Sequence, residues 1–234
     1  ATPPSSSSPR SRVAEPGAPG LPPAGTMNDL AEWEFQRLYG PWSPLHPTSV
    51  RALLDGAGFT WWVAGGWSLE ADPRRPRRRH EDVDVSVLGD ELDAVREWLR
   101  GFHLWQPQAG ALRPLRRGEP LPEGCEQLWV RRDAYSPWVM DLVVTPRDGD
   151  DWVFKRDHRI RRPLAQVWCR GPDGVPYQRP EVGLLFKAHL RRDKDVTDLD
   201  AAWPRLDEPA RSWLRDSVAE VSPGHPWLAR MAAG

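Results

Sequence analysis

The chain has 234 residues, with 32 basic and 33 acidic side chains and a formal net charge of −1. This balance provides no whole-protein attraction to nucleic acid. No apolar run approaches the ~20 residues that span a bilayer, so we expect no membrane partner. We also expect no secretory signal. Cys125 and Cys169 lie far apart without a C-x-x-C spacing, which is typical of reduced thiols, and we predict a cytoplasmic protein.

The N-terminal part of the chain divides into a tail and the first predicted elements. Residues 1–26 are rich in Pro, Ser, Gly and Ala and nearly lack large apolar side chains, so we predict a disordered tail. Apolar spacing predicts helices over residues 28–39 and 49–58. A strand is expected at residues 59–63, and it leads directly into the most informative stretch of the sequence.

That stretch is VAGGWSLEADPRRPRRRHEDVDV, residues 63–85. Asp82 and Asp84 alternate with Val83 and Val85, so in a strand the two carboxylates point to one face and the valines to the other. Two neighbouring carboxylates are costly unless a cation lies between them. Mg²⁺ prefers carboxylates, waters and substrate phosphates, so the pair is a candidate ligand set for this ion.

The glycine pair Gly65-Gly66 comes just before a predicted short helix. Such a turn brings bare backbone N–H groups close to a phosphate. Ser68 is a candidate hydrogen-bond donor to phosphate, the alternative being an ordinary serine in a first helical turn. We interpret Glu70 as a solvated charge, the alternative being a third acidic group near the site. The glycine turn and the D-x-D strand together predict a site for a metal–nucleotide complex.

Five arginines lie within residues 73–79, where proline and charge repulsion favour a loop. A solvated surface is the simplest interpretation of this run. Contact with a nucleotide triphosphate is one alternative, and sequence-independent contact with RNA or DNA is another. We expect His80 to orient the loop by hydrogen bonding rather than to transfer a catalytic proton.

The GGW opening at residues 65–67 and the HEDVD ending at residues 80–84 resemble the core motif of the DNA polymerase β-like nucleotidyltransferase superfamily. The long arginine-rich connection between them is most similar to the aminoglycoside 2''-nucleotidyltransferase branch. The resemblance implies an α/β (α+β) fold, in which a mixed sheet flanked by helices is followed by a small helical region. It also implies Mg²⁺-dependent transfer of a nucleoside monophosphate from an NTP, expected to be ATP, to a hydroxyl of a small acceptor such as an aminoglycoside.

Further elements follow the motif in the chain. The patterns predict a helix at residues 91–101, strands at 103–106 and 126–133, and a loop at 107–124 that overhangs the site. Short strand candidates within residues 150–178 are expected to form a β-hairpin extension of the sheet.

Asp141 interrupts an apolar run that covers residues 138–144. A charge within a buried strand needs a physical reason. By the resemblance, Asp141 matches the third acidic position of the superfamily, which implies a metal ligand or a general base for the acceptor hydroxyl. The alternative is an aspartate at a strand edge that pairs with an arginine.

Helices are predicted from Pro180 to the C-terminus, which gives a catalytic domain over residues 27–179 and a helical region over 180–234. Lys187 and Lys194 resemble the basic residues that follow the catalytic sheet in related enzymes, so they are candidate triphosphate contacts. The alternatives are a helix lysine that snorkels to solvent and a salt-bridged surface turn, respectively.

The predicted chemistry is two-metal phosphoryl transfer, with Asp82, Asp84 and Asp141 as Mg²⁺ ligands. An acidic cluster suits a polycationic aminoglycoside, but Mg²⁺ binding requires the same cluster, so the acceptor depends on the resemblance alone. Two alternatives remain: a nucleotidyltransferase that modifies RNA or protein, and a non-catalytic nucleotide-binding protein of the same fold. The three aspartates argue against the second.

Overall fold

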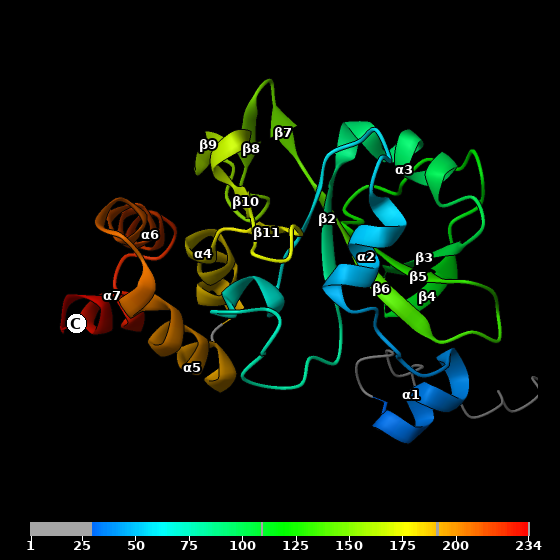
Figure 1. The fold of residues 1–234 in the computed structure, drawn as a ribbon, viewed down its shortest axis with the longest axis horizontal. Coiled ribbons are helices and arrows are strands. Elements are labelled where there is room, and N and C mark those ends of the chain that lie inside the picture. The colour runs from blue at the N-terminus through cyan, green and yellow to red at the C-terminus, as the bar shows by residue number, and fades with distance from the viewer. Residues whose placement is uncertain (1–29, 109, 191, 234) are drawn as a thin grey trace, which may run out of the picture.

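The computed structural model describes residues 30–108, 110–190 and 192–233, so the predicted tail at residues 1–26 lies outside the described residues. A mixed sheet stands at the centre, with α2 and α3 beside it and the C-terminal helices gathered at the other end (Figure 1). The helices are α1 Glu32–Tyr39, α2 Pro47–Leu54, α3 Leu92–Trp98, α4 Pro180–Leu190, α5 Asp193–Ala202, α6 Glu208–Val221 and α7 Pro226–Ala233. None of these described helices is long and apolar enough to cross a membrane.

The central sheet has eight strands in the order β10-β11-β1-β2-β6-β5-β3-β4. β2 runs parallel to β6 and antiparallel to β1, so the predicted mixed sheet is confirmed. The strands are β1 Trp61–Val63, β2 Asp84–Leu88, β3 His103–Gln108, β4 Ala111–Pro114, β5 Gln127–Arg131, β6 Trp138–Thr145, β10 Trp168–Arg170 and β11 Pro176–Gln178. A second sheet contains β7 Arg147–Asp148, β8 Asp151–Val153 and β9 Arg161–Pro163.

The alternation of side chains along β2 determines which face of the sheet carries the chemistry. Val85 and Val87 are fully buried in a cluster that includes Val50 and Leu54 of α2 and residues of α3. Because side chains alternate along a strand, Asp84 and Ser86 face the side of the sheet opposite to these valines. Helices α2 and α3 therefore cover the valine face of the sheet, and the face that carries Asp84 is left free for a cavity.

The C-terminal helices pack against the other end of the sheet. Trp62 of β1, Phe154 after β8, Leu184 of α4 and Leu214 of α6 are all fully buried in one cluster. The burial of apolar side chains from β1 and from the C-terminal helices in one cluster stabilises their mutual placement. The helical region begins at Pro180 as predicted, and its assignment as a separate unit from residue 180 stays a prediction.

Two regions differ from the predictions. The expected loop at residues 107–124 contains β4, which pairs antiparallel with β3, and the Pro- and Gly-rich composition of its turns concealed this hairpin. Residues 150–178 do not form a single hairpin. β8 and β9 belong to the separate three-stranded sheet, whereas the β10-β11 hairpin joins the central sheet beside β1.

Candidate active site

The glycine turn lies directly over the first strand aspartate. Gly65 has a positive φ of 61°, which favours glycine, and a Cβ at this position would collide with the carboxylate of Asp84. A Cβ at Gly66 would lie 2.6 Å from a guanidinium nitrogen of Arg78 and 2.8 Å from Nδ1 of His80. Asp84, Arg78 and His80 can approach the turn only because neither glycine carries a side chain. Local packing therefore requires the two glycines, as would a bound phosphate.

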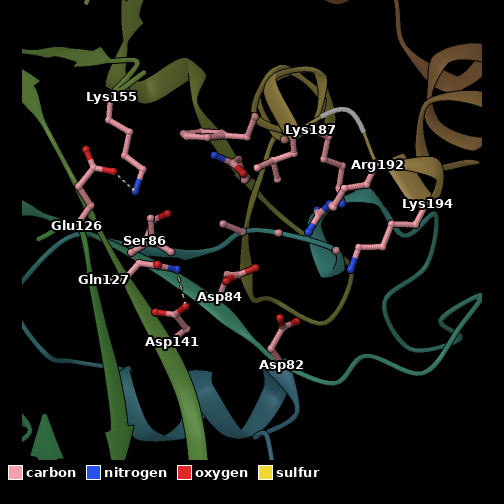
Figure 2. Close-up of a pocket in the computed structure, with 18 of the residues that line it drawn as sticks. Asp82, Asp84, Ser86, Glu126, Gln127, Asp141, Lys155, Lys187, Arg192 and Lys194 are labelled. Atoms are coloured by element: carbon pink, nitrogen blue, oxygen red, sulfur yellow. Dashed lines mark hydrogen bonds and ion pairs between the residues drawn. The ribbon is translucent and has the colours of Figure 1, made fainter. Parts of the chain in front are cut away.

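Two of the predicted carboxylates meet on neighbouring strands. Asp84 of β2 and Asp141 of β6 are direct partners in the parallel register, so their side chains lie on the same face of the sheet. Asp82 precedes β2 rather than belonging to it, but it lines the same cavity (Figure 2). The structure thus brings together the three aspartates that the sequence analysis singled out.

The segment that carries Asp82 is held by the tryptophan and histidine of the motif. Trp67 donates its indole N–H to the carbonyl of Asp82 at 3.2 Å and stacks on His80, with ring centroids 4.3 Å apart. His80 is buried and its Nε2 lies 2.9 Å from Oε1 of Glu70. Burial lowers the pKa of His80. These contacts agree with the expected orienting role of this histidine.

Glu70 is not the solvated charge that the sequence favoured. It is buried and accepts hydrogen bonds from the backbone N–H of Arg77 at 3.0 Å and from His80. Arg77 also reaches Asp198 of α5 at 3.3 Å. Glu70 and Asp198 therefore hold Arg77 of the arginine-rich loop between them, a role of Glu70 that neither sequence interpretation anticipated.

The arginine run divides into different environments. Arg74 pairs with Asp72 and is exposed, and Arg77 makes the contacts just described. Arg78 lines the cavity of the three aspartates. The run is thus neither wholly solvated surface nor wholly a ligand contact.

All three lysines of the chain line the same cavity, although arginine is far more frequent in this sequence. Lys155 is nearly buried and lies 3.1 Å from Oε2 of Glu126. Lys187 is buried, with Nζ 3.0 Å from Asp198 and 3.3 Å from Asp195. Lys194 is exposed at the rim. Lysine presents a compact point charge, so this arrangement is suited to a polyanion.

Sequence reasoning missed three cavity cations, Lys155, Arg156 and Arg192. Lys155 follows β8 in the second sheet, far from the motif in sequence. The rarity of lysine in this chain is the one signal that points to it. Arg192 pairs with Asp195 at 2.9 Å, and its charged neighbourhood resembles an ordinary salt-bridged turn. Figure 2 shows Lys155 on one side of the cavity and Lys187, Arg192 and Lys194 on another, with the aspartates below them.

Ser68, a predicted phosphate donor, has another hydrogen-bond partner. Its hydroxyl donates to the carbonyl of Gly65 at 2.8 Å, closing the turn at the start of a short 3-10 helix, Trp67–Leu69. Ser68 is buried and is absent from the described residues that line the cavity. The contribution visible in the structure is therefore to fix the glycine turn.

The environment of the carboxylates fits a divalent cation, although no group of three His, Cys, Asp or Glu side chains in the described residues is already arranged around a metal position. Burial and the charge of Asp82 raise the pKa of Asp84 to about 7. Burial and the charge of Asp84 raise the pKa of Asp141 well above its usual range. Asp141 Oδ1 is buried and has no hydrogen-bond partner among the described residues. Hard oxygen donors in this state are suited to Mg²⁺, whose charge would relieve their repulsion.

Gln127 determines which oxygen of Asp141 stays available. Its side-chain amide donates to Oδ2 at 2.8 Å, which leaves Oδ1 as the oxygen without a partner. Gln127 lies on β5, next to β6 in the sheet. A cavity of about 330 Å³ is thus bounded by carboxylates, cations and the bare glycine backbone.

Comparison with known proteins agrees with this geometry. The aminoglycoside-2''-adenylyltransferase family matches residues 48–114. Two curated proteins named 2''-aminoglycoside nucleotidyltransferase, from Escherichia coli and Klebsiella pneumoniae, are each 32% identical over 122 residues, which cover 51% of this chain and 67% of the relative.

A solved structure shows the same fold. The crystal structure of ANT(2'')-Ia in complex with adenylyl-2''-tobramycin aligns with a TM-score of 0.51 and 12% identity, covering 75% of this chain and 98% of that one. This likeness concerns the fold, whereas the curated relatives match in sequence over two thirds of their length. With its glycine turn and three converging aspartates, the chain belongs to the aminoglycoside-2''-adenylyltransferase family of nucleotidyltransferases.

Proposed function

We propose that this enzyme transfers the adenylyl group of ATP, with Mg²⁺, to a hydroxyl of an aminoglycoside. The observation that carries the proposal is the meeting of three aspartates and all three lysines in one cavity that the glycine turn also lines. The acceptor class is supported by the curated relatives, which are named 2''-aminoglycoside nucleotidyltransferases.

The cationic wall is the proposed binding site of the triphosphate. Lys155, Lys187 and Lys194 place positive charge around the cavity, and the backbone of Gly65 and Gly66 can approach a phosphate without steric hindrance. Charge-assisted contacts of this type are stronger than neutral hydrogen bonds.

Asp82 and Asp84 are the proposed Mg²⁺ ligands, with Asp141 as a shared ligand or as the base. Mg²⁺ bound there would supply electrostatic stabilisation of the charge on the phosphate oxygens. Asp141 Oδ1 accepts the proton of the acceptor hydroxyl, whose oxygen forms a bond to the α-phosphorus. The bond from that phosphorus to the bridging oxygen breaks, and pyrophosphate leaves with the electron pair.

The test combines binding with turnover. Calorimetric titration of ATP, GTP, CTP and UTP, with Mg²⁺ or EDTA, is expected to show metal-dependent binding with ATP preferred. The wild type should then release pyrophosphate from ATP only when an aminoglycoside such as tobramycin is present. Nucleotide binding without turnover on any aminoglycoside would contradict the acceptor while leaving the nucleotide site intact.

The alternative of RNA or protein modification has less support. Arg74 and Arg77 of the arginine-rich loop are held by carboxylates of the same chain. We also propose a cytoplasmic location, supported by an exposed free thiol at Cys169, which is typical of a reducing compartment.

A further inference from the structure

A second cavity, of about 810 Å³, lies against the same carboxylates. It shares Glu81, Asp82 and Asp141 with the lysine-lined cavity. The rest of its lining differs: it includes Glu32 and Gln36 of α1, the segment at Trp42, and Trp129 of β5. A molecule in this cavity would reach the carboxylates from outside the proposed triphosphate site.

Helix α1 is fastened to the sheet and can serve as a fixed wall. The carbonyl of Tyr39, its last residue, accepts hydrogen bonds from the indole of Trp138 at 3.0 Å and from Arg131 at 3.3 Å. Phe35 packs against Trp129 with ring centroids 5.9 Å apart. These contacts present Glu32, near the start of the helix, at the cavity.

The charge of this cavity is opposite to that of the lysine-lined one. Carboxylates are contributed by Glu32, Glu81, Asp82 and Asp141, against the single guanidinium of Arg79. Within the described residues, Glu32, Glu81 and Asp82 form no ion pair. Such a volume attracts cations and repels a triphosphate.

Two further features indicate a ligand rather than an acidic surface alone. Trp42 and Trp129 meet edge to face, with centroids 5.0 Å apart, and tryptophan faces bind both sugar rings and ammonium groups. Asp141 is only 6% exposed, and its unpartnered Oδ1 belongs to a residue that lines both cavities. A molecule that enters from the acidic side therefore lies beside a residue that also lines the proposed triphosphate site.

We propose that this second cavity binds the acceptor, and that Glu32 of α1 recognises one of its ammonium groups while Trp42 and Trp129 contact its sugar rings. This inference rests on the proposed function and specifies its acceptor subsite. Glu32 and Trp42 precede residues 48–114, the part of the chain that the family matches. That match therefore assigns no role to the α1 wall, on which acceptor selection would depend.

The test compares two carboxylates of α1 in the full-length protein. Glu32→Gln removes the charge at the cavity, whereas Glu34→Gln changes a glutamate of the same helix that does not belong to the described cavity lining and instead caps the helix at Ala31. Both variants are titrated with tobramycin, and KM is measured separately for tobramycin and for ATP. Loss of a charged hydrogen bond corresponds to about a 10-fold change.

We expect Glu32→Gln to raise the tobramycin KM and dissociation constant about 10-fold, with the KM for ATP unchanged and Glu34→Gln like the wild type. Tobramycin binding by the wild type should also weaken more with added salt than binding by Glu32→Gln. A Glu32→Gln variant that adenylylates tobramycin as well as the wild type would overturn the subsite and leave the proposed function standing. A wild type that binds ATP but neither binds nor modifies any aminoglycoside would overturn both.

Discussion

The two cavities meet at the same carboxylates but have opposite characters. One is bounded by lysines and arginines from the segment after β8, from α4, from the start of α5 and from the arginine-rich loop. The other is bounded by acidic and aromatic side chains from α1, the Trp42 segment and β5. In the proposed function the same aspartates serve two substrates, because a polyanion is attracted to the first cavity and a polycation to the second.

The strongest test of this comparison removes the shared carboxylate row. We expect Asp84→Asn to lower kcat/KM for adenylyl transfer by about 10³-fold or more, because it removes a ligand charge on which stabilisation of the transition state depends. The measurement is pyrophosphate release with ATP, Mg²⁺ and tobramycin. Asp93→Asn, at an exposed aspartate of α3, is the matched control. Full activity of Asp84→Asn would contradict the proposed role of Asp84 as a metal ligand.

A change on the cationic side should affect one substrate only. We expect Lys155→Met to raise the KM for ATP about 10-fold, the scale of one charged hydrogen bond, while the KM for tobramycin stays unchanged. Lys155→Arg retains the charge, so its KM for ATP should lie between those of the wild type and Lys155→Met. An equal rise in both KM values would show that Lys155 supports the whole site rather than the nucleotide side.

A smaller effect is expected from Gln127, which binds Oδ2 of Asp141. Gln127→Ala should reduce kcat about 5-fold, because a typical hydrogen bond contributes roughly 1 kcal/mol net. Both KM values should stay unchanged. Gln127→Asn tests whether a shorter amide restores the rate. A variant that raises either KM without changing kcat would exclude the orienting role.

The smallest effect concerns the stability of the metal-free protein. The pKa of Asp84 is raised to about 7, so the folded state retains a proton that the unfolded state has already lost, and stability falls as pH rises toward 7. Asp84→Asn has no such proton. In EDTA at about pH 8 we expect its Tm to exceed that of the wild type, by about 2–4 °C per kcal/mol of relief, with a smaller difference at about pH 5.

Scanning fluorimetry at both pH values, with and without Mg²⁺, measures this effect. Added Mg²⁺ should raise the Tm of the wild type more than that of Asp84→Asn, because a ligand that binds only the folded state stabilises it. A Tm difference independent of pH would show that the raised pKa of Asp84 is not its cause.

Local patterns in the sequence already define the centre of this protein. The alternation at Asp84 and Val85, the glycine pair, and the lone charge of Asp141 in an apolar run are local patterns with a period of two or a turn requirement. They predicted the sheet, the buried valines and the three aspartates that line one cavity. The helices predicted after Pro180 likewise include α6 at residues 208–221.

The surroundings of that centre depend on contacts between distant segments of the chain. Lys155 lines one cavity with the aspartates because the second sheet folds beside the first. Glu32 lines the other cavity with Asp82 and Asp141 because α1 is fastened to β5 and β6. Neither position follows from local pattern, since contacts between distant segments depend on strand order and packing. Glu70 makes the same point: its sequence favoured solvent, but two donors brought to it by folding made burial possible, since a buried charge is tolerated when it is paired.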